Sequence, residues 1–69
     1  MKIFIDRQKR LYQAKLETLD TSKMGDFYEA RILNAVIRQL ERMQSQGMVN
    51  TTKHELQKIR NHWHRQLMD

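Results

Sequence analysis

The sequence predicts an all-α fold, either a small three-helix bundle or a helical hairpin that oligomerises. Along three segments, apolar residues recur at intervals of three and four, as on the buried face of a helix. Proline is absent, and the two glycines, Gly25 and Gly47, lie where this periodicity is interrupted. A chain of 69 residues is long enough for one layer of core, so we expect a single helical domain over residues 1–69.

The first helix is expected at about residues 6–19. Its buried face consists of four apolar residues spaced seven, four and three apart: Ile5, Tyr12, Leu16 and Leu19. Asp6 is the expected N-cap, because a carboxylate can accept a hydrogen bond from the free backbone N–H groups of the first turn. The preceding residues 2–5 favour a strand, but no second strand is indicated elsewhere, and we therefore expect no sheet.

The second helix, at about residues 26–46, has the widest apolar face. Six residues share it and span an arc of about 140°: Ile32, Leu33, Val36, Ile37, Leu40 and Met43. An arc this wide predicts contact with two other helices. Asp26 followed by Glu29 is an acidic variant of the capping box at the start of the helix, and Gly47 is expected to terminate it.

The third helix is expected at about residues 52–68. Thr52 and Glu55 match the capping box S/T-x-x-E. A narrow apolar stripe follows at spacings of three, four and four: Leu56, Ile59, Trp63 and Leu67. Short connections between three helices favour an up-down-up bundle, and the alternative is a hairpin of long helices that dimerises into a larger bundle.

No sequence pattern predicts catalysis, a cofactor or a small-molecule substrate. The chain contains no cysteine, no glycine-rich loop and no G-x-S-x-G motif, which removes the common nucleophile and phosphate-binding arrangements. We therefore expect a protein that is not an enzyme. The first apolar run is only three residues long, so we also expect a soluble cytoplasmic protein that does not bind membranes.

The three histidines do not have the spacing of a metal site. His62 and His64 are two residues apart and therefore point in different directions from a helix. His54 lies two turns away from His62, which is too far for both side chains to bind one ion. We expect exposed histidines and no bound metal.

The charge of the chain favours nucleic acid as a partner. The formal net charge is +5, and the excess lies towards both ends of the sequence. Arg31, Arg38 and Arg42 follow one flank of the apolar face of the second helix. When the apolar stripe of the third helix faces inward, its opposite face carries four residues that can contact phosphates and base edges: His54, Lys58, Asn61 and Arg65.

We therefore expect a small, basic, non-enzymatic regulatory or accessory protein that binds nucleic acid as a homodimer. Lys58, Asn61 and Arg65 are the expected contacts, and three more residues are expected to assist: His54, Arg38 and Arg42. The alternative is a protein-binding adaptor or inhibitor that docks an apolar helical surface onto a larger protein or assembly. Its five methionines would suit such a surface, because methionine side chains adapt readily to a partner.

Trp63 shares the inward stripe of the third helix and is expected to be largely buried. Replacing it with alanine should then lower the free energy of unfolding by roughly 3 kcal/mol or more, as truncation of a large aromatic residue in a core does. Urea denaturation of the wild type and of Trp63→Ala measures this difference. The melting temperatures of the two proteins are measured as well, and an unchanged value would show that the apolar stripe is mis-assigned.

Overall fold

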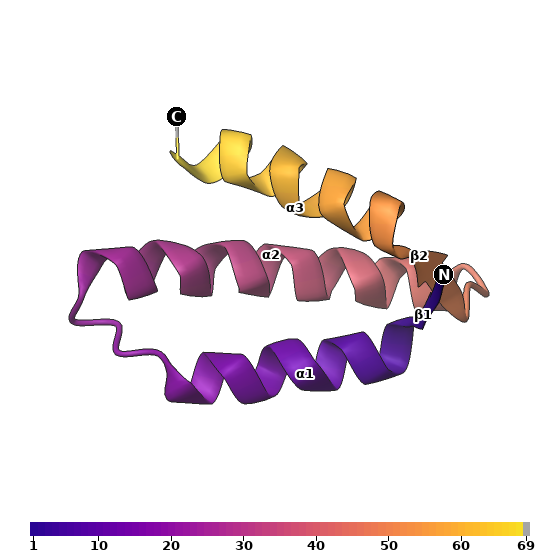
Figure 1. Ribbon diagram of the computed structural model, residues 1–69, viewed down its shortest axis with the longest axis horizontal. Coiled ribbons are helices and arrows are strands. Elements are labelled where there is room, and N and C mark those ends of the chain that lie inside the picture. Colours follow the sequence, from indigo (N-terminus) through magenta and orange to yellow (C-terminus); the bar gives the residue numbers. More distant parts are fainter. Residues whose placement is uncertain (69) are drawn as a thin grey trace.

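A computed structural model describes residues 1–68 and confirms a mostly helical fold with three helices. The elements in chain order are β1 (Lys2–Phe4), α1 (Ile5–Thr18), α2 (Met24–Ser45), β2 (Asn50–Thr52) and α3 (Lys53–Met68). The chain runs along α1, returns along α2 and reverses again along α3 (Figure 1). Asp69, the last residue of the expected domain, lies outside the described residues.

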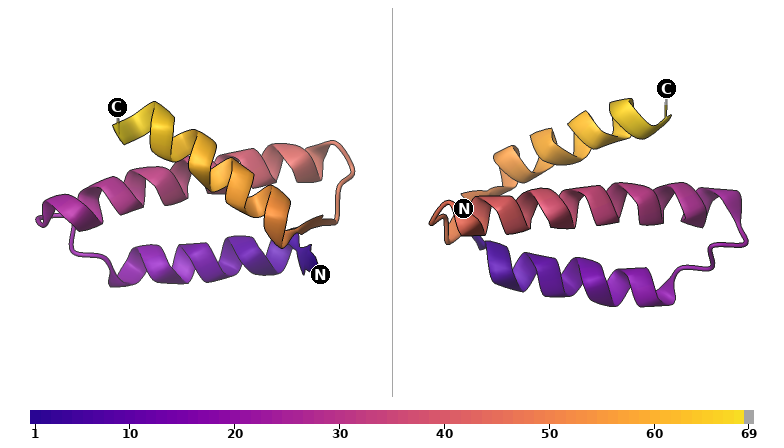
Figure 2. Two further views of the ribbon diagram at one scale, coloured as in Figure 1. Left: turned by 45° about the horizontal axis from the view of Figure 1, so that its top comes forward. Right: turned by 180° about the vertical axis from the view of Figure 1, so that it is seen from behind.

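Helix α2 lies between the other two helices and packs against both of them (Figure 1). Nine apolar residues are buried within residues 1–68, and α2 contributes five of them: Ile32, Leu33, Val36, Ile37 and Leu40. Two residues from each outer helix complete the core: Ile5, Tyr12, Leu56 and Ile59. The prediction that the wide apolar face of this helix contacts two neighbours is confirmed. Helix α1 runs alongside α2, whereas α3 crosses it obliquely (Figure 2).

The expectation of no sheet is wrong, because β1 and β2 form an antiparallel pair in which Ile3 lies opposite Thr51. Each strand leads directly into a helix, so the pair holds the starts of α1 and α3 together near the end of α2 (Figure 1). The backbone N–H of Ile5 adds a hydrogen bond of 3.0 Å to the carbonyl of Val49. Strand β2 has only three residues and no apolar alternation, and its pairing partner is far away in the sequence.

The end of α2 and the start of α3 follow the predicted signals. Gly47 has a φ of 91°, which is the left-handed conformation that favours glycine after a helix. The N–H of Met48 donates to the carbonyl of Met43 at 3.0 Å, as in a Schellman motif. At the start of α3, Thr52 Oγ1 accepts the backbone N–H of Glu55 at 3.0 Å. Both termini are therefore stabilised by local hydrogen bonds.

The expected caps of α1 and α2 are wrong. Helix α1 begins one residue before Asp6, because the chain enters it directly from β1, and Asp6 instead pairs with Arg10 one turn later. Helix α2 begins two residues before Asp26, whose carboxylate accepts the backbone N–H of Asp20 in the preceding loop at 2.9 Å. Both carboxylates still lie in the first turn of their helices, where they interact favourably with the helix dipole.

Leu33 is fully buried in α2. Leu33→Ala should lower the free energy of unfolding by about 2–5 kcal/mol, because it removes buried apolar surface and leaves a cavity. Urea denaturation followed by circular dichroism measures the loss. Leu11→Ala is the matched control, since Leu11 is 56% exposed and its truncation should cost far less. Equal losses in the two variants would contradict the assignment of the core.

Candidate functional site

Glu29 on α2 joins both outer helices through basic side chains. Its Oε1 accepts a hydrogen bond of 3.1 Å from Arg60 Nη2 on α3 and lies 3.9 Å from Lys15 Nζ on α1. The guanidinium of Arg60 also lies over the ring of Tyr12, 5.7 Å from its centroid. Burial lowers the pKa of Arg60, but the interactions with Glu29 and Tyr12 outweigh it and raise the pKa. These basic residues therefore stabilise the packing of the helices.

Lys9 has a similar structural role between α1 and α2. Its Nζ donates a hydrogen bond of 2.8 Å to Gln44 Oε1 and lies 3.8 Å from Glu41 Oε2. The side chain of Lys9 is mostly covered, because only 17% of it is exposed. Lys9 is thus a further basic residue whose charge is already balanced within the fold.

Three arginines on α2 form an exposed row, which we call the arginine stripe: Arg31, Arg38 and Arg42. Their spacings of seven and four place them within about 40° of one another around the helix. Within residues 1–68, none of the three forms an ion pair with a carboxylate. The stripe is therefore a concentrated positive charge that the described part of the chain does not neutralise.

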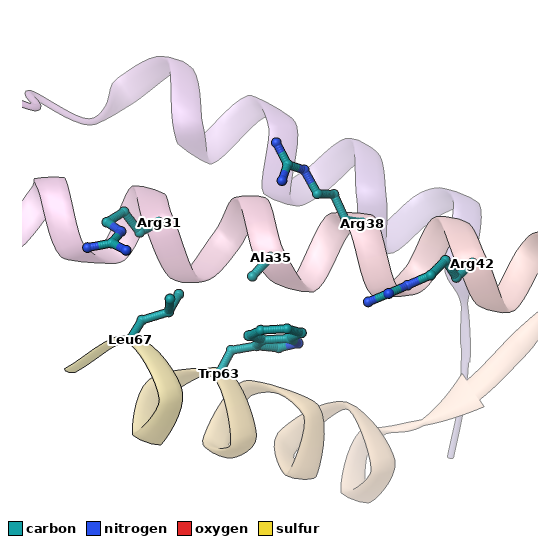
Figure 3. A pocket seen from close by; sticks show the side chains of 6 residues that line it. All are labelled: Arg31, Ala35, Arg38, Arg42, Trp63 and Leu67. Carbon is teal, nitrogen blue, oxygen red and sulfur yellow. The ribbon is translucent and has the colours of Figure 1, made fainter. Parts of the chain in front are cut away.

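A groove of about 640 Å³ lies beside the arginine stripe, between α2 and α3 (Figure 3). We call it the α2–α3 groove. The arginine stripe and three further residues line it: Ala35, Trp63 and Leu67. Figure 3 shows Trp63 and Leu67 facing α2 from α3, with the small side chain of Ala35 directed towards the indole. The groove thus combines cationic groups from one helix with an aromatic surface from the other.

Trp63 was expected to be largely buried; the structure packs its partly buried side chain against the core, and the indole also lines the groove. The small side chain of Ala35 points towards the ring from α2 (Figure 3). Trp63 Nε1 donates a hydrogen bond of 2.7 Å to Gln39 Oε1, and the ring of His62 lies against the indole with 5.0 Å between centroids and an interplanar angle of 81°. Truncation of Trp63 should therefore cost less stability than the roughly 3 kcal/mol expected for a buried residue.

The six residues predicted from the sequence to contact nucleic acid lie on two separate surfaces. Arg38 and Arg42 line the α2–α3 groove. The other four are exposed on the face of α3 that points away from Trp63: His54, Lys58, Asn61 and Arg65. The structure therefore does not bring the six together into one site.

Two residues on this outer face of α3 already have local partners. Lys58 Nζ lies 3.8 Å from Glu55 Oε1, and Asn61 Oδ1 accepts a hydrogen bond of 2.9 Å from Gln57 Nε2. Each partner lies on the same helix, one turn before the residue it contacts. A ligand on this face would have to compete with these contacts, whereas the arginine stripe has no carboxylate partner within residues 1–68.

The sequence contained a signal for part of the groove but not for all of it. Arg31 lies seven residues before Arg38, so the shared helix face follows from spacing alone. The contribution of Trp63 does not follow from spacing, because its position in an apolar stripe indicates burial. The groove also depends on residues of a different helix, such as Ala35, which points towards the indole from α2 (Figure 3).

Comparison of the chain with protein-family models, with curated proteins and with solved structures found no match. Within residues 1–68, no helix has both the length and the apolar composition needed to cross a membrane. The same residues contain no group of three or more His, Cys, Asp or Glu side chains placed to bind a metal ion. The arginine stripe and the α2–α3 groove therefore form the candidate functional site.

Glu29→Gln should lower the free energy of unfolding by about 1–2 kcal/mol, because it removes the acidic partner that Lys15 and Arg60 share. The side chains of Arg60 and Glu29 are only 27% and 28% exposed, so water replaces the lost interaction incompletely. Urea denaturation measures the change. Glu55→Gln is the control, because its pair with Lys58 is more exposed and should contribute less than about 0.5 kcal/mol. Indistinguishable losses would show that the bridge through Glu29 does not stabilise the bundle.

Proposed function

We propose that this chain is a cytoplasmic, non-enzymatic accessory or regulatory protein that binds nucleic acid through the arginine stripe. One observation carries the proposal: Arg31, Arg38 and Arg42 form a continuous exposed row without carboxylate partners in residues 1–68. Other basic residues, such as Arg60 and Lys9, are held by acidic or polar partners inside the bundle. The stripe thus places three cationic groups without acidic partners in residues 1–68 on one face of α2, beside the α2–α3 groove.

Phosphate is the ligand chemistry that such a row fits. A guanidinium presents several N–H donors in a plane and can donate two hydrogen bonds to one phosphate. Arg31 and Arg42 are eleven residues apart, which corresponds to roughly 16 Å along the helix axis. A row of this length can follow several phosphates of a polymer, whereas a single phosphate would use only one end of it. A polyanion with regularly spaced charges is therefore the favoured partner.

The outer face of α3 offers a second, weaker contact surface for the same partner. Lys58 and Arg65 add positive charge there, and Asn61 could donate to or accept from a base edge. The pairing of Lys58 with Glu55 reduces the net charge of this face. We therefore assign the main phosphate contacts to the arginine stripe and a supporting role to α3.

Two variants with equal charge loss test this assignment. The first replaces the arginine stripe with glutamine (Arg31→Gln, Arg38→Gln and Arg42→Gln), and the second replaces three basic residues of α3 (Lys53→Gln, Lys58→Gln and Arg65→Gln). Fluorescence anisotropy with a labelled single strand and a labelled duplex, at low and moderate salt, gives the affinities. The stripe variant should bind at least tenfold more weakly than the α3 variant. Its plot of log Kd against log salt concentration should be shallower by about two, since each lost phosphate contact removes ~0.7–0.9 from the slope.

Absence of binding by the wild-type protein to any single strand or duplex at low salt would refute the proposal. A larger loss in the α3 variant than in the stripe variant would place the main contact on the outer face of α3. Circular dichroism of both variants confirms that the comparison is made between folded proteins. Glutamine is chosen because it is nearly as favourable in a helix as arginine.

Exposed apolar residues near the start of α1 favour a second candidate function, docking onto another protein. Phe4 and Leu11 are 57% and 56% exposed and line a shallow hollow together with Ile3 and Arg7. Neighbouring apolar side chains with this exposure are typical of contact surfaces. The partner could be a second copy, as in the homodimer expected from the sequence, or a larger protein. Light scattering of the wild type and of Phe4→Ser with Leu11→Ser decides whether this surface joins two copies.

A further inference from the structure

We infer that the α2–α3 groove accepts an unstacked base, so that the protein prefers single-stranded nucleic acid to a duplex. The inference rests on the proposed function and assigns a substrate class to the same site. Three features carry it: the free cationic row on α2, the partly exposed indole of Trp63 beside it, and a groove between them of about 640 Å³. Phosphates would lie on the arginine stripe while a base enters the groove and contacts the indole.

The two walls of the groove match the two chemical parts of a nucleotide. The α2 side presents guanidinium groups for the phosphate, and the α3 side presents Trp63 and Leu67 for the apolar faces of a base (Figure 3). Its volume lies within the range of about 300–1,000 Å³ that is typical of small-ligand pockets. Proteins that bind single strands without sequence preference combine these same elements, a positive groove and an aromatic stacking surface.

The indole is held in a defined orientation before any ligand binds. Its Nε1 donates to Gln39 Oε1 at 2.7 Å, and the imidazole of His62 lies nearly perpendicular to it. Ala35, a small residue, points towards the ring from α2 (Figure 3). An aromatic side chain that is already fixed loses little conformational freedom when a base stacks on it, which favours binding.

A duplex cannot use the groove in this way. Its bases are paired and stacked on one another, so that only their edges are accessible from outside. Trp63 is partly buried between two helices, and a base would have to leave the stack to reach it. A single strand has bases that are free to do so, while its phosphates remain available to the arginine stripe. The duplex therefore keeps the phosphate contacts and loses the contact with the indole.

The intrinsic fluorescence of Trp63 tests the inference directly, because it is the only tryptophan in the chain. Three unlabelled probes are titrated: a thymidine oligonucleotide of about 16 nucleotides, an abasic strand of the same length, and a duplex of the same length. The thymidine strand should quench the emission and bind most tightly. The abasic strand and the duplex should bind through their phosphates more weakly and leave the emission nearly unchanged. Labelled forms of all three give the affinities by anisotropy.

Ala35→Leu provides a second, independent measurement. The larger side chain should fill the space in front of the indole while the arginines and Trp63 remain in place. The affinity for the thymidine strand should fall by about tenfold, in the range reported for loss of one base–aromatic contact. The affinity for the abasic strand should stay as in the wild type. Ala14→Leu is the matched control, since Ala14 is exposed on α1 and does not line the groove.

The outcomes separate this inference from the proposed function. If the thymidine strand binds without changing the emission of Trp63, and Ala35→Leu binds it as the wild type does, the base does not enter the groove and the inference is wrong. A duplex that binds as tightly as the thymidine strand would likewise overturn it. Polyglutamate, a polyanion without bases, is an additional probe, and an affinity equal to that of the thymidine strand would show that the site selects charge alone. If none of the three nucleic-acid probes binds, the proposed function itself fails.

Discussion

Helix α2 has an apolar face that is too wide for a single neighbouring helix to cover. Its buried residues, from Ile32 to Leu40, need a partner on each side, and α1 and α3 provide them with narrow apolar stripes of their own. Neither outer helix has enough apolar residues to form a core without α2. The order of the helices in space, with α2 between the other two, follows from this requirement.

The strand pair and the bridge through Glu29 fix how the outer helices sit on α2. Strands β1 and β2 tie the starts of α1 and α3 together at one end of the bundle. Glu29 lies in the N-terminal part of α2 and forms ion pairs with Arg60 of α3 and Lys15 of α1. Because α3 is held at its start and crosses α2 obliquely, the surface of α2 beside Trp63 remains open to solvent (Figures 2 and 3).

Within residues 1–68, acidic side chains pair with some of the basic residues and not with others. Those that point between the helices, such as Arg60 and Lys9, are paired and contribute to packing. The arginine stripe lies on the surface of α2 that neither neighbour covers, and within residues 1–68 no carboxylate pairs with it. Like charges that are neighbours on one helix face destabilise the helix unless a ligand of opposite charge binds to them. The unpaired arginine stripe is therefore a feature that favours a role in binding an anionic ligand.

The sequence by itself determined the features that depend on neighbours along the chain. The three helices, the wide apolar face of α2, the left-handed turn at Gly47 and the Thr52 cap all follow from spacing or from hydrogen bonds within one turn. The alignment of Arg31 with Arg38 and Arg42 is of the same kind, since a helix repeats its faces at fixed intervals.

Only the tertiary structure decided the features that depend on residues from different segments. The pairing of Ile3 with Thr51 joins two three-residue strands that are far apart in the sequence and would be only marginally stable as an isolated pair. The groove beside Trp63 is formed by residues of two helices, since Ala35 and the arginine stripe line it from α2. An apolar stripe shows which side of a helix turns inward, but whether each side chain on it is covered depends on what the neighbouring helix places opposite. For that reason the apolar stripe indicated that Trp63 faces inward, but only the packing of α3 on α2 showed that it also lines the candidate site.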